Sequence, residues 1–215
     1  MITIYGRATS SNVQLVMWLV GELGLKHRRL DYGHDHGGLD DPKFAEMTPH
    51  RLIPVIKEGK TVVWESAAIN RYIAARHGAG GPFWPEDPAL RAQSDMWAEW
   101  GKTTFLPAFT GPIFWRQVRT PAAERDQAAL LEAIDRFEGL LKVIAKPLSD
   151  SPYMAGEEPG LADLTLGHVL YRWFDMEIER KKNAVIEDYY QRLADRPAYR
   201  KHVMVDYSPL RAEEV

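Results

Sequence analysis

The stretch RLIPVIKEGKTVVWES, residues 51–66, decides how the first third of this chain folds. Residues 55–59 and 61–64 read as two strands around the turn Glu58-Gly59-Lys60, in which glycine tolerates positive φ. Pro54 stands at the head of the first strand, where it removes a ladder donor. From the hairpin alone, Pro54 is either a plain edge-strand proline or a device that turns main-chain groups toward a ligand. Glu65-Ser66 then opens an apolar-periodic helix.

The segments around this hairpin alternate between strand and helix patterns. An apolar run predicts the first strand, apolar residues at helical spacing up to Gly24 predict a helix, and a weaker strand follows. With the hairpin these give the order β-α-β-α-β-β-α. The expected strands before the hairpin are 2–5 and 28–32, residues 6–11 are expected to form a polar loop, and the expected helices are 13–24, 42–47 and 66–77.

The pattern changes after a Gly/Pro-rich segment without periodicity, GAGGPFWPEDP. Beyond it no strand is predicted, and prolines at 121, 147, 152, 159 and 197 punctuate the expected helices 89–104, 122–144, 161–174 and 184–195. We therefore predict an α/β domain over residues 1–79, a linker over 80–87 and an all-α domain over 88–215.

Composition excludes several classes of function. The chain has 215 residues, a net charge of −3 and the apolar and charged fractions of an ordinary globular protein. This charge offers no attraction to nucleic acid or to an anionic membrane, no run is long enough to span a bilayer, and the first 30 residues lack the features of a signal peptide. With no cysteine, disulfides and thiolate catalysis by the protein are excluded, and a cytoplasmic location is expected.

Several motifs in order resemble the cytosolic glutathione S-transferases, most closely serine-type bacterial members. They cover nearly the whole chain: YGRATSSNVQLVMWLVGELGL (5–25), TPHRLIPVI (48–56), WESAAINRYIAARHG (64–78), FWPEDPALRAQSDMWAEW (83–100), GLADLTLGHVLYRW (160–173) and RPAYRKHV (196–203). The resemblance implies a thioredoxin-like glutathione-binding domain followed by a helical bundle. It also implies a homodimer and a role in detoxification, with glutathione as co-substrate and no metal.

The resemblance assigns roles around the hairpin. Pro54 is expected to be cis, with the main chain of Ile53 binding the cysteinyl part of glutathione like a short edge strand. Ser66 and the amides of its helix suit the γ-glutamyl carboxylate, and Glu65 suits the γ-glutamyl ammonium. His50 and Arg51 fall where the family contacts the glycyl carboxylate. Arg51 replaces a small residue there, and a solvated surface arginine is the alternative interpretation.

The nucleophile must be the thiol of glutathione, because the chain has none. Ser10 is the preferred hydrogen-bond donor to the sulfur, Ser11 is second and Asn12 third. The reason is that Ser11 and Gln14 fit a capping box, which would occupy Ser11 and leave Ser10 free. The alternative is that all three are only cap residues.

The remaining candidates lie elsewhere in the chain. Aromatic residues crowd the start of the second half, and Trp100, Thr104 and Phe105 are the candidates for an apolar electrophile site, although an aromatic stripe at helical spacing is more often core. His34-Asp35-His36 reads as a solvated loop rather than a metal site. Asp163 is interpreted as a folding residue, with Gly160 at the N-cap in place of the family's Ser or Thr.

The expected function is a glutathione transferase that activates the glutathione thiol for attack on a small apolar electrophile. A glutathione-dependent isomerase, dehalogenase or peroxidase would use the same thiolate. A non-catalytic glutathione-binding interaction protein on the same fold is the alternative from another class, and retention of Ile53-Pro54, Glu65-Ser66 and a serine at the first helix argues against it.

Overall fold

A four-stranded sheet forms one end of the molecule in this computed structural model, which describes residues 1–213. The spatial order is β2-β1-β3-β4, with β1 parallel to β2 and the other neighbouring pairs antiparallel. The predicted hairpin is confirmed, with Val55 paired to Trp64 and Glu58 to Thr61. The strands are β1 (Ile2–Tyr5), β2 (His27–Leu30), β3 (Val55–Glu58) and β4 (Thr61–Trp64).

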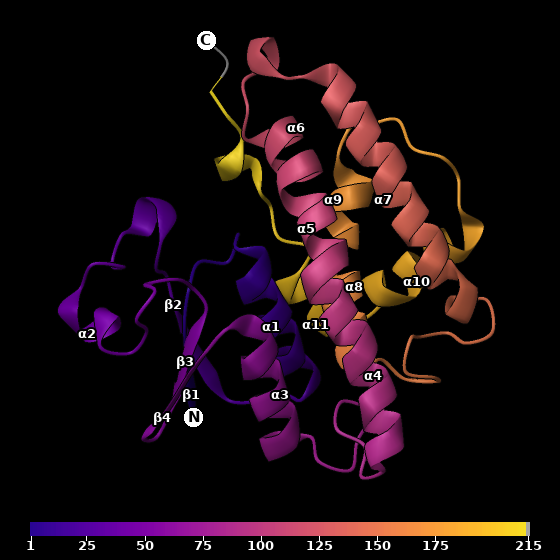
Figure 1. Ribbon diagram of the computed structural model, residues 1–215. Coiled ribbons are helices and arrows are strands. Elements are labelled where there is room, and N and C mark those ends of the chain that lie inside the picture. The colour runs from indigo at the N-terminus through magenta and orange to yellow at the C-terminus, as the bar shows by residue number, and fades with distance from the viewer. Residues whose placement is uncertain (214–215) are drawn as a thin grey trace.

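Helices cover both faces of this sheet. Figure 1 shows α1 and α3 between the sheet and the rest of the molecule, with α2 on the far side. The second strand begins one residue before its predicted start and ends two before its predicted end, and the short helix also ends two residues early. These helices are α1 (Ser11–Glu22), α2 (Pro42–Ala45) and α3 (Ser66–His77).

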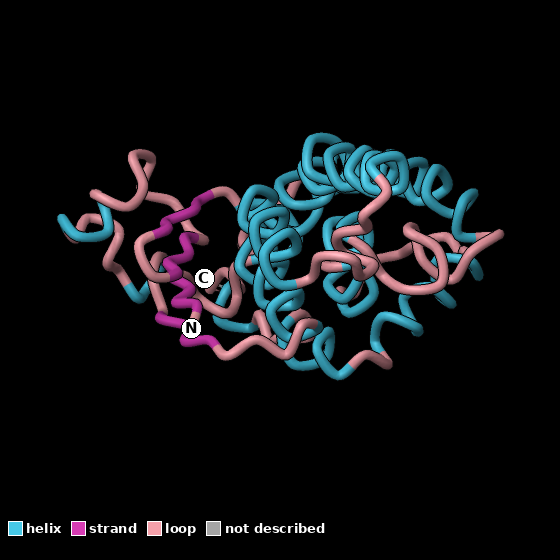
Figure 2. The backbone as a smooth tube through the Cα atoms, turned by 90° about the horizontal axis from the view of Figure 1, so that it is seen from below, coloured by secondary structure: helices cyan, strands magenta, loops and turns pink. Residues whose placement is uncertain are grey.

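The second half of the described chain is helical, as predicted, and Figure 2 shows the strands confined to one end. The sequence analysis assigned no element to residues 106–118, yet two π-helical segments, Gly101–Phe105 and Thr110–Trp115, join short helices there into one rod with α4 (Figure 1). The helices are α4 (Pro88–Trp100), α5 (Leu106–Phe109), α6 (Arg116–Val118), α7 (Gln127–Leu148), α8 (Leu161–Gly167), α9 (Leu170–Asp175), α10 (Ala184–Ala194) and α11 (Pro197–His202), with 3-10 turns at His34–His36, Ala122–Glu124 and Ser208–Leu210.

Pro147 does not interrupt its helix, which corrects the prediction. It lies in the last turn of α7. Proline there removes the hydrogen bond to the carbonyl four residues earlier. That residue, Val143, is exposed, so water can satisfy its carbonyl. No helix within residues 1–213 has the length and apolar character needed to cross a membrane.

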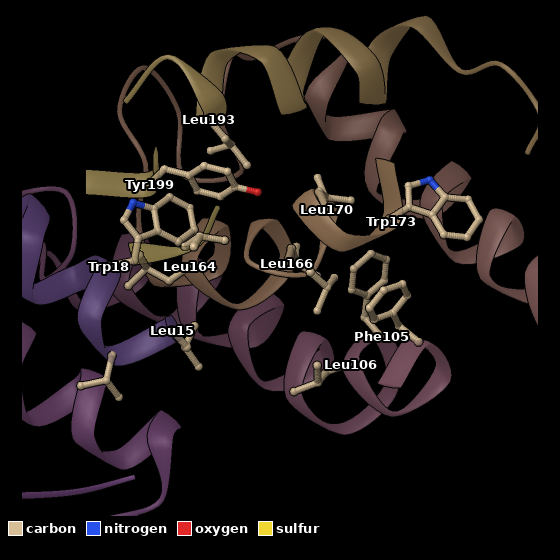
Figure 3. Packing of buried hydrophobic residues seen from close by; sticks show 14 of the residues in the cluster. Leu15, Trp18, Phe105, Leu106, Leu164, Leu166, Leu170, Trp173, Leu193 and Tyr199 are labelled. Carbon is tan, nitrogen blue, oxygen red and sulfur yellow. The ribbon is translucent and has the colours of Figure 1, made fainter. Parts of the chain in front are cut away.

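One continuous core joins the sheet end to the helical half. Helix α1 is buried at every position from Val13 to Val20. The ring of Trp18 meets the ring of Tyr199 in α11 edge-on, with centroids 4.8 Å apart (Figure 3). A Cβ at Gly167 in α8 would lie 2.5 Å from Leu193 and 3.2 Å from Trp18, so only glycine allows this approach. The helical half is therefore seated directly on α1.

Asp163 organises the start of α8, as the sequence analysis expected of a folding residue. Gly160 occupies the N-cap, and its N–H donates to Asp163 Oδ2 at 2.8 Å. The Met154 N–H and the Tyr189 hydroxyl both donate to Oδ1 at 2.8 Å. The carboxyl group is fully buried, so its function is to join α8, α10 and the preceding loop.

We predict that Asp163→Ala destabilises the fold strongly. Three donors would lose their acceptor at a cost of about 1–3 kcal/mol each, so the total loss should be about 3 kcal/mol or more. Urea unfolding measures this, and Tyr189→Phe, which removes one of the three bonds, is the matched control at about 1 kcal/mol. Equal stability of the two variants would contradict this role of Asp163.

Candidate functional site

A small cavity opens where the loop before β3 meets the start of α3. The Ile53–Pro54 peptide bond in its wall is cis, as the resemblance implied. In the described residues no hydrogen bond is made to the main-chain N–H or C=O of Ile53, so both groups are available to a ligand. The cavity is lined by Asn12, His50, Leu52, Ile53, Pro54, Glu65 and Ser66.

Glu65 is held at this cavity in an unusual backbone conformation. Its φ is 66° and its ψ 119°, a region that costs a non-glycine residue about 1–3 kcal/mol and is found mainly at functional sites. Its Oε1 lies 3.2 Å from His50 Nε2, and His50 Nδ1 lies 2.7 Å from the hydroxyl of buried Thr48. His50 therefore positions a half-exposed carboxylate at the cavity.

A lysine from the helical half reaches the other side of the cavity. Lys102 Nζ donates to Asn12 Oδ1 at 2.7 Å and to Ser66 Oγ at 2.9 Å. The Ser66 hydroxyl in turn donates to Asn12 Oδ1 at 3.1 Å. An ammonium group has three donors, so one N–H of Lys102 remains for a ligand.

Lys102 carries a partly buried charge without a direct counter-ion. Burial lowers its pKa, and the carboxylates of Glu65 and Glu99 oppose this shift. Within the described chain no carboxylate lies at ion-pair distance from Nζ. A partly buried cation that lacks a counter-ion is unfavourable, so an anionic group bound beside Ser66 would relieve this cost.

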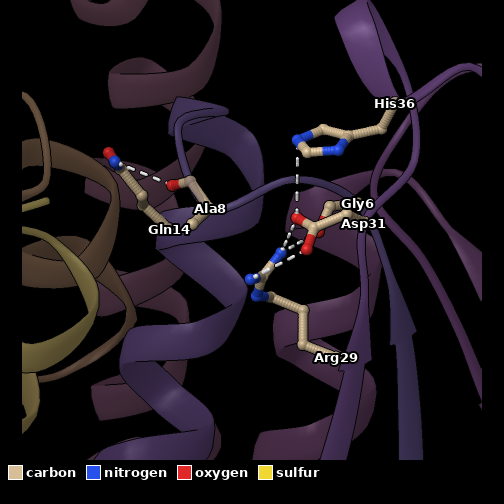
Figure 4. A network of polar contacts seen from close by, with 6 residues as sticks. All are labelled: Gly6, Ala8, Gln14, Arg29, Asp31 and His36. Atoms are coloured by element: carbon tan, nitrogen blue, oxygen red, sulfur yellow. Dashed lines mark hydrogen bonds and ion pairs between the residues drawn. The ribbon is translucent and has the colours of Figure 1, made fainter. Parts of the chain in front are cut away.

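The predicted capping box at the start of α1 is wrong. The helix begins at Ser11, which places Ser10 at the N-cap, and neither hydroxyl makes a cap hydrogen bond. Gln14 does not reach back to Ser11; its Nε2 donates to the carbonyl of Ala8 at 3.0 Å (Figure 4). The reason is that Gln14 faces the interior, where it is almost fully buried. Both serine hydroxyls are therefore free of partners among the described residues.

Three side chains fix the loop that leads to Ser10. Gln14 holds the carbonyl of Ala8, and Arg29 Nη1 donates to the carbonyl of Gly6 at 2.9 Å while also pairing with Asp31 (Figure 4). Arg172 Nη2, from α9, donates to the carbonyl of Thr9 at 2.6 Å. The position of Ser10 is thus set by contacts to both halves of the molecule.

The structure separates some predicted site residues from the cavity. Arg51 does not line it; Arg51 Nη1 pairs with Asp40 Oδ1 at 2.9 Å on the surface. Phe105 is wholly buried between Trp100 and Phe137 and is a core residue, which corrects its assignment to a substrate site. Trp100 is half-buried and Thr104 exposed.

Sequence reasoning missed Lys102 and Arg172. Lys102 is 90 residues from Asn12, and Arg172 is 163 residues from Thr9. No local pattern marks either residue, because each owes its place to the packing of the helical half on α1. Within residues 1–213 no group of three or more His, Cys, Asp or Glu side chains is arranged to hold a metal ion.

Comparisons with known proteins match both halves of the chain. The family model "Glutathione S-transferase, N-terminal domain" matches residues 1–75, and "Glutathione S-transferase, C-terminal domain" matches residues 95–197. Glutathione S-transferase GstB of Escherichia coli (strain K12) is 33% identical over 210 residues, which are 97% of this chain and 100% of that protein. Glutathione S-transferase 3 of Zea mays is 28% identical over 94% of this chain and 93% of its own.

A solved structure also resembles the molecule closely. It is the theta class glutathione S-transferase from the citrus canker pathogen Xanthomonas axonopodis pv. citri with glutathione bound. The two chains share 38% identity and superpose with a TM-score of 0.89, over 95% of this chain and 98% of that one.

Proposed function

The chain belongs to the glutathione S-transferase family, and from that premise we propose how it binds glutathione and transfers it to a small electrophile. The thiolate of glutathione attacks an electrophilic carbon, a C–S bond forms, the leaving group departs with the bonding electrons, and the thiol proton passes to solvent. The observation that carries the proposal is the partly buried Lys102 ammonium, which bridges Asn12 and Ser66 and retains a free N–H.

The γ-glutamyl end of glutathione fits the charges around the cavity. Its carboxylate would accept from Lys102 Nζ and from the first amides of α3, where the helix dipole favours an anion. The Ser66 hydroxyl would also donate to it once its bond to Asn12 Oδ1 is released. Its ammonium would pair with Glu65, which His50 already positions. The unpaired main chain of Ile53 would bind the cysteinyl part. For Arg51, contact with the glycyl carboxylate would require the Asp40 pair to break.

Ser10 is the proposed donor to the glutathione sulfur. A thiol of pKa about 8.5 must fall by about two units to be mostly ionised at neutral pH, which is about 2.7 kcal/mol. One hydrogen bond to a charged group supplies about 1.5–3 kcal/mol, and the N-terminus of α1 adds about 0.3–1 kcal/mol. The free hydroxyl at the N-cap therefore suffices, without a strong base.

We predict that Ser66→Ala, Glu65→Ala and Lys102→Met each raise the KM for glutathione about tenfold with little change in kcat at saturation. These groups are remote from the sulfur and contribute uniform binding, and loss of one charge-assisted bond is about 1.5 kcal/mol or more. Steady-state kinetics measure this. Lys60→Met, in the exposed β3–β4 turn, is the control for Lys102. An unchanged KM in all three variants would exclude this binding mode.

Ser10→Ala should raise the pKa of bound glutathione and slow conjugation at neutral pH. Part of the rate should return at alkaline pH, where the thiol ionises unaided. Thiolate absorbance against pH, with glutathione bound, tests this. Ser11→Ala is the matched control and should leave both the titration and the stability nearly unchanged, because Ser11 makes no cap bond. If only Ser11→Ala shifts the pKa of bound glutathione, Ser11 is the donor to the sulfur in place of Ser10. If neither variant shifts it, the donor is Asn12 or a main-chain amide.

We also propose a homodimer that uses the surface formed by β4, α3 and α4. Arg71 of α3 pairs with Asp95 and Glu99 of α4, both at 2.8 Å, which joins these helices. Large apolar side chains are exposed on β4 and α4: Trp64 at 39%, Leu90 at 55% and Met96 at 61%. A partner that covers them would gain apolar burial.

Sedimentation should accordingly give a particle of twice the mass of one chain at micromolar concentration. Met96→Glu should shift the dimer toward the monomer, because the new carboxylate would be buried without a partner in the interface. Val143→Glu, at an exposed apolar position on α7, should leave the dimer intact. A wild-type monomer would refute the homodimer.

We further propose a cytoplasmic location, a role in detoxification and a division of the chain into two domains. A cytoplasmic location is expected from the absence of cysteine, and detoxification follows from conjugation of reactive electrophiles. The division into residues 1–79, 80–87 and 88–215 is proposed because no helix or strand lies between the end of α3 at His77 and the start of α4 at Pro88. The sequence predicted an apolar electrophile from Trp100, Thr104 and Phe105. Phe105 no longer supports this prediction, because its side chain is buried in the core.

A further inference from the structure

Three arginines from three segments act on one another through their charges beside the loop that carries Ser10. Arg7 belongs to the loop itself, Arg119 follows α6, and Arg172 lies in α9. We call these residues the arginine cluster. Arg172 is 4% exposed, donates to the Thr9 carbonyl and places its guanidinium 4.3 Å from the centre of the Phe114 ring. Arg172 therefore contacts the loop of the site directly, and the main-chain carbonyl of Arg7 accepts from the Ser10 N–H at 3.2 Å.

The positive charge of the arginine cluster is poorly compensated. The Nε atoms of Arg7 and Arg172 are both buried and without a hydrogen-bond partner. No carboxylate pairs directly with any member of the cluster in the part of the chain that the structure describes. Burial is the main cause that lowers the pKa of Arg7, and the charge of Arg119 adds to this shift. Asp35, the acid that opposes it, belongs to an exposed loop.

A purely structural role explains the position of only one arginine of the cluster, Arg172. Arg172 fixes the Thr9 carbonyl, and its burial against Phe114 stabilises it by a cation–π contact. Arg7 and Arg119 make no comparable contact to the loop through their side chains. Arg119 is exposed, with its guanidinium 5.5 Å from the ring of half-exposed Trp115. Within residues 1–213 neither guanidinium group makes a hydrogen bond or an ion pair, so both can bind a ligand.

We propose that the electrophile carries an oxyanion group, such as a carboxylate, which Arg7 and Arg119 bind while its reactive carbon faces the sulfur at Ser10. Guanidinium groups suit this role because their planar forks match a carboxylate. The inference rests on the proposed transferase function and names its substrate class. The chemistry is unchanged: the thiolate forms the C–S bond, the leaving group departs with its electron pair, and the oxyanion takes no part in bond making.

A matched pair of probes tests the inference: 4-chloro-3-nitrobenzoate, which is anionic, and 4-chloro-3-nitrobenzamide, which is neutral. Both lose chloride when glutathione attacks the ring. Each kcat/KM is divided by the rate constant of free glutathione with the same probe, which removes the difference in intrinsic reactivity. For the wild-type protein, the normalised kcat/KM for the benzoate should be about ten times that for the benzamide. This ratio should fall as salt is added, because salt screens the charge of exposed Arg119.

Arg7→Gln and Arg119→Gln should each lower this ratio by about tenfold. Arg136→Gln, which removes an exposed charge on α7, should leave it unchanged. Arg119→Gln is the safer variant for folding because the side chain is exposed, and thermal unfolding checks both.

Two results would overturn the inference while leaving the transferase intact. One is a wild-type ratio near one. The other is an equal loss of activity with both probes in Arg7→Gln and Arg119→Gln, which would show that the cluster acts on the thiolate. Failure to conjugate either probe, or other activated halides, would overturn the proposed function and this inference with it.

Discussion

The burial of α1 is the constraint on which the rest of the structure depends. This helix packs between α3 of the sheet end and α8 and α11 of the helical half. Gly167 permits the contact with Trp18, and a Cβ at Gly21 would lie 2.8 Å from His202. The sides of α1 are enclosed by these helices, so its N-terminus is the polar part of the helix that reaches the cavity. Ser10 and Asn12 therefore lie where both halves of the molecule meet.

The helical half completes the site with charge. Gly101 lets α4 and its π-helical continuation approach α8, since a Cβ there would lie 2.8 Å from Thr165. The next residue is Lys102, whose ammonium crosses to Asn12 and Ser66. π-Helical segments are frequent at functional sites because they change the direction of side chains within a helix. The cation that would receive glutathione is thus held by helix packing rather than by the sheet.

Two separate groups of cations flank the start of α1. Lys102 lies on the side of Ser66, where a γ-glutamyl carboxylate would bind, and Arg172 of the arginine cluster donates to the carbonyl of Thr9. Glu65 is the acid at the cavity, fixed by His50 and by its own strained backbone. A ligand that carries both an ammonium and a carboxylate would be oriented by these residues, because its ammonium would pair with Glu65 and its carboxylate with Lys102. The sulfur would then lie between the two cationic groups.

The sequence by itself determined the order of strands, the hairpin at 55–64, the helix beginning at Ser66 and the structural role of Asp163 beside Gly160, because turns, caps and periodicity depend on near neighbours. Its motifs also identified the family and placed Ile53, Pro54, Glu65 and Ser66 around one cavity. Only the tertiary structure decided that Ser10 rather than Ser11 is the N-cap, that Phe105 belongs to the core and that Arg51 turns to Asp40. It alone brought Lys102 and Arg172 to the site, because contacts across 90 and 163 residues are fixed by how the two halves pack, which no local pattern encodes.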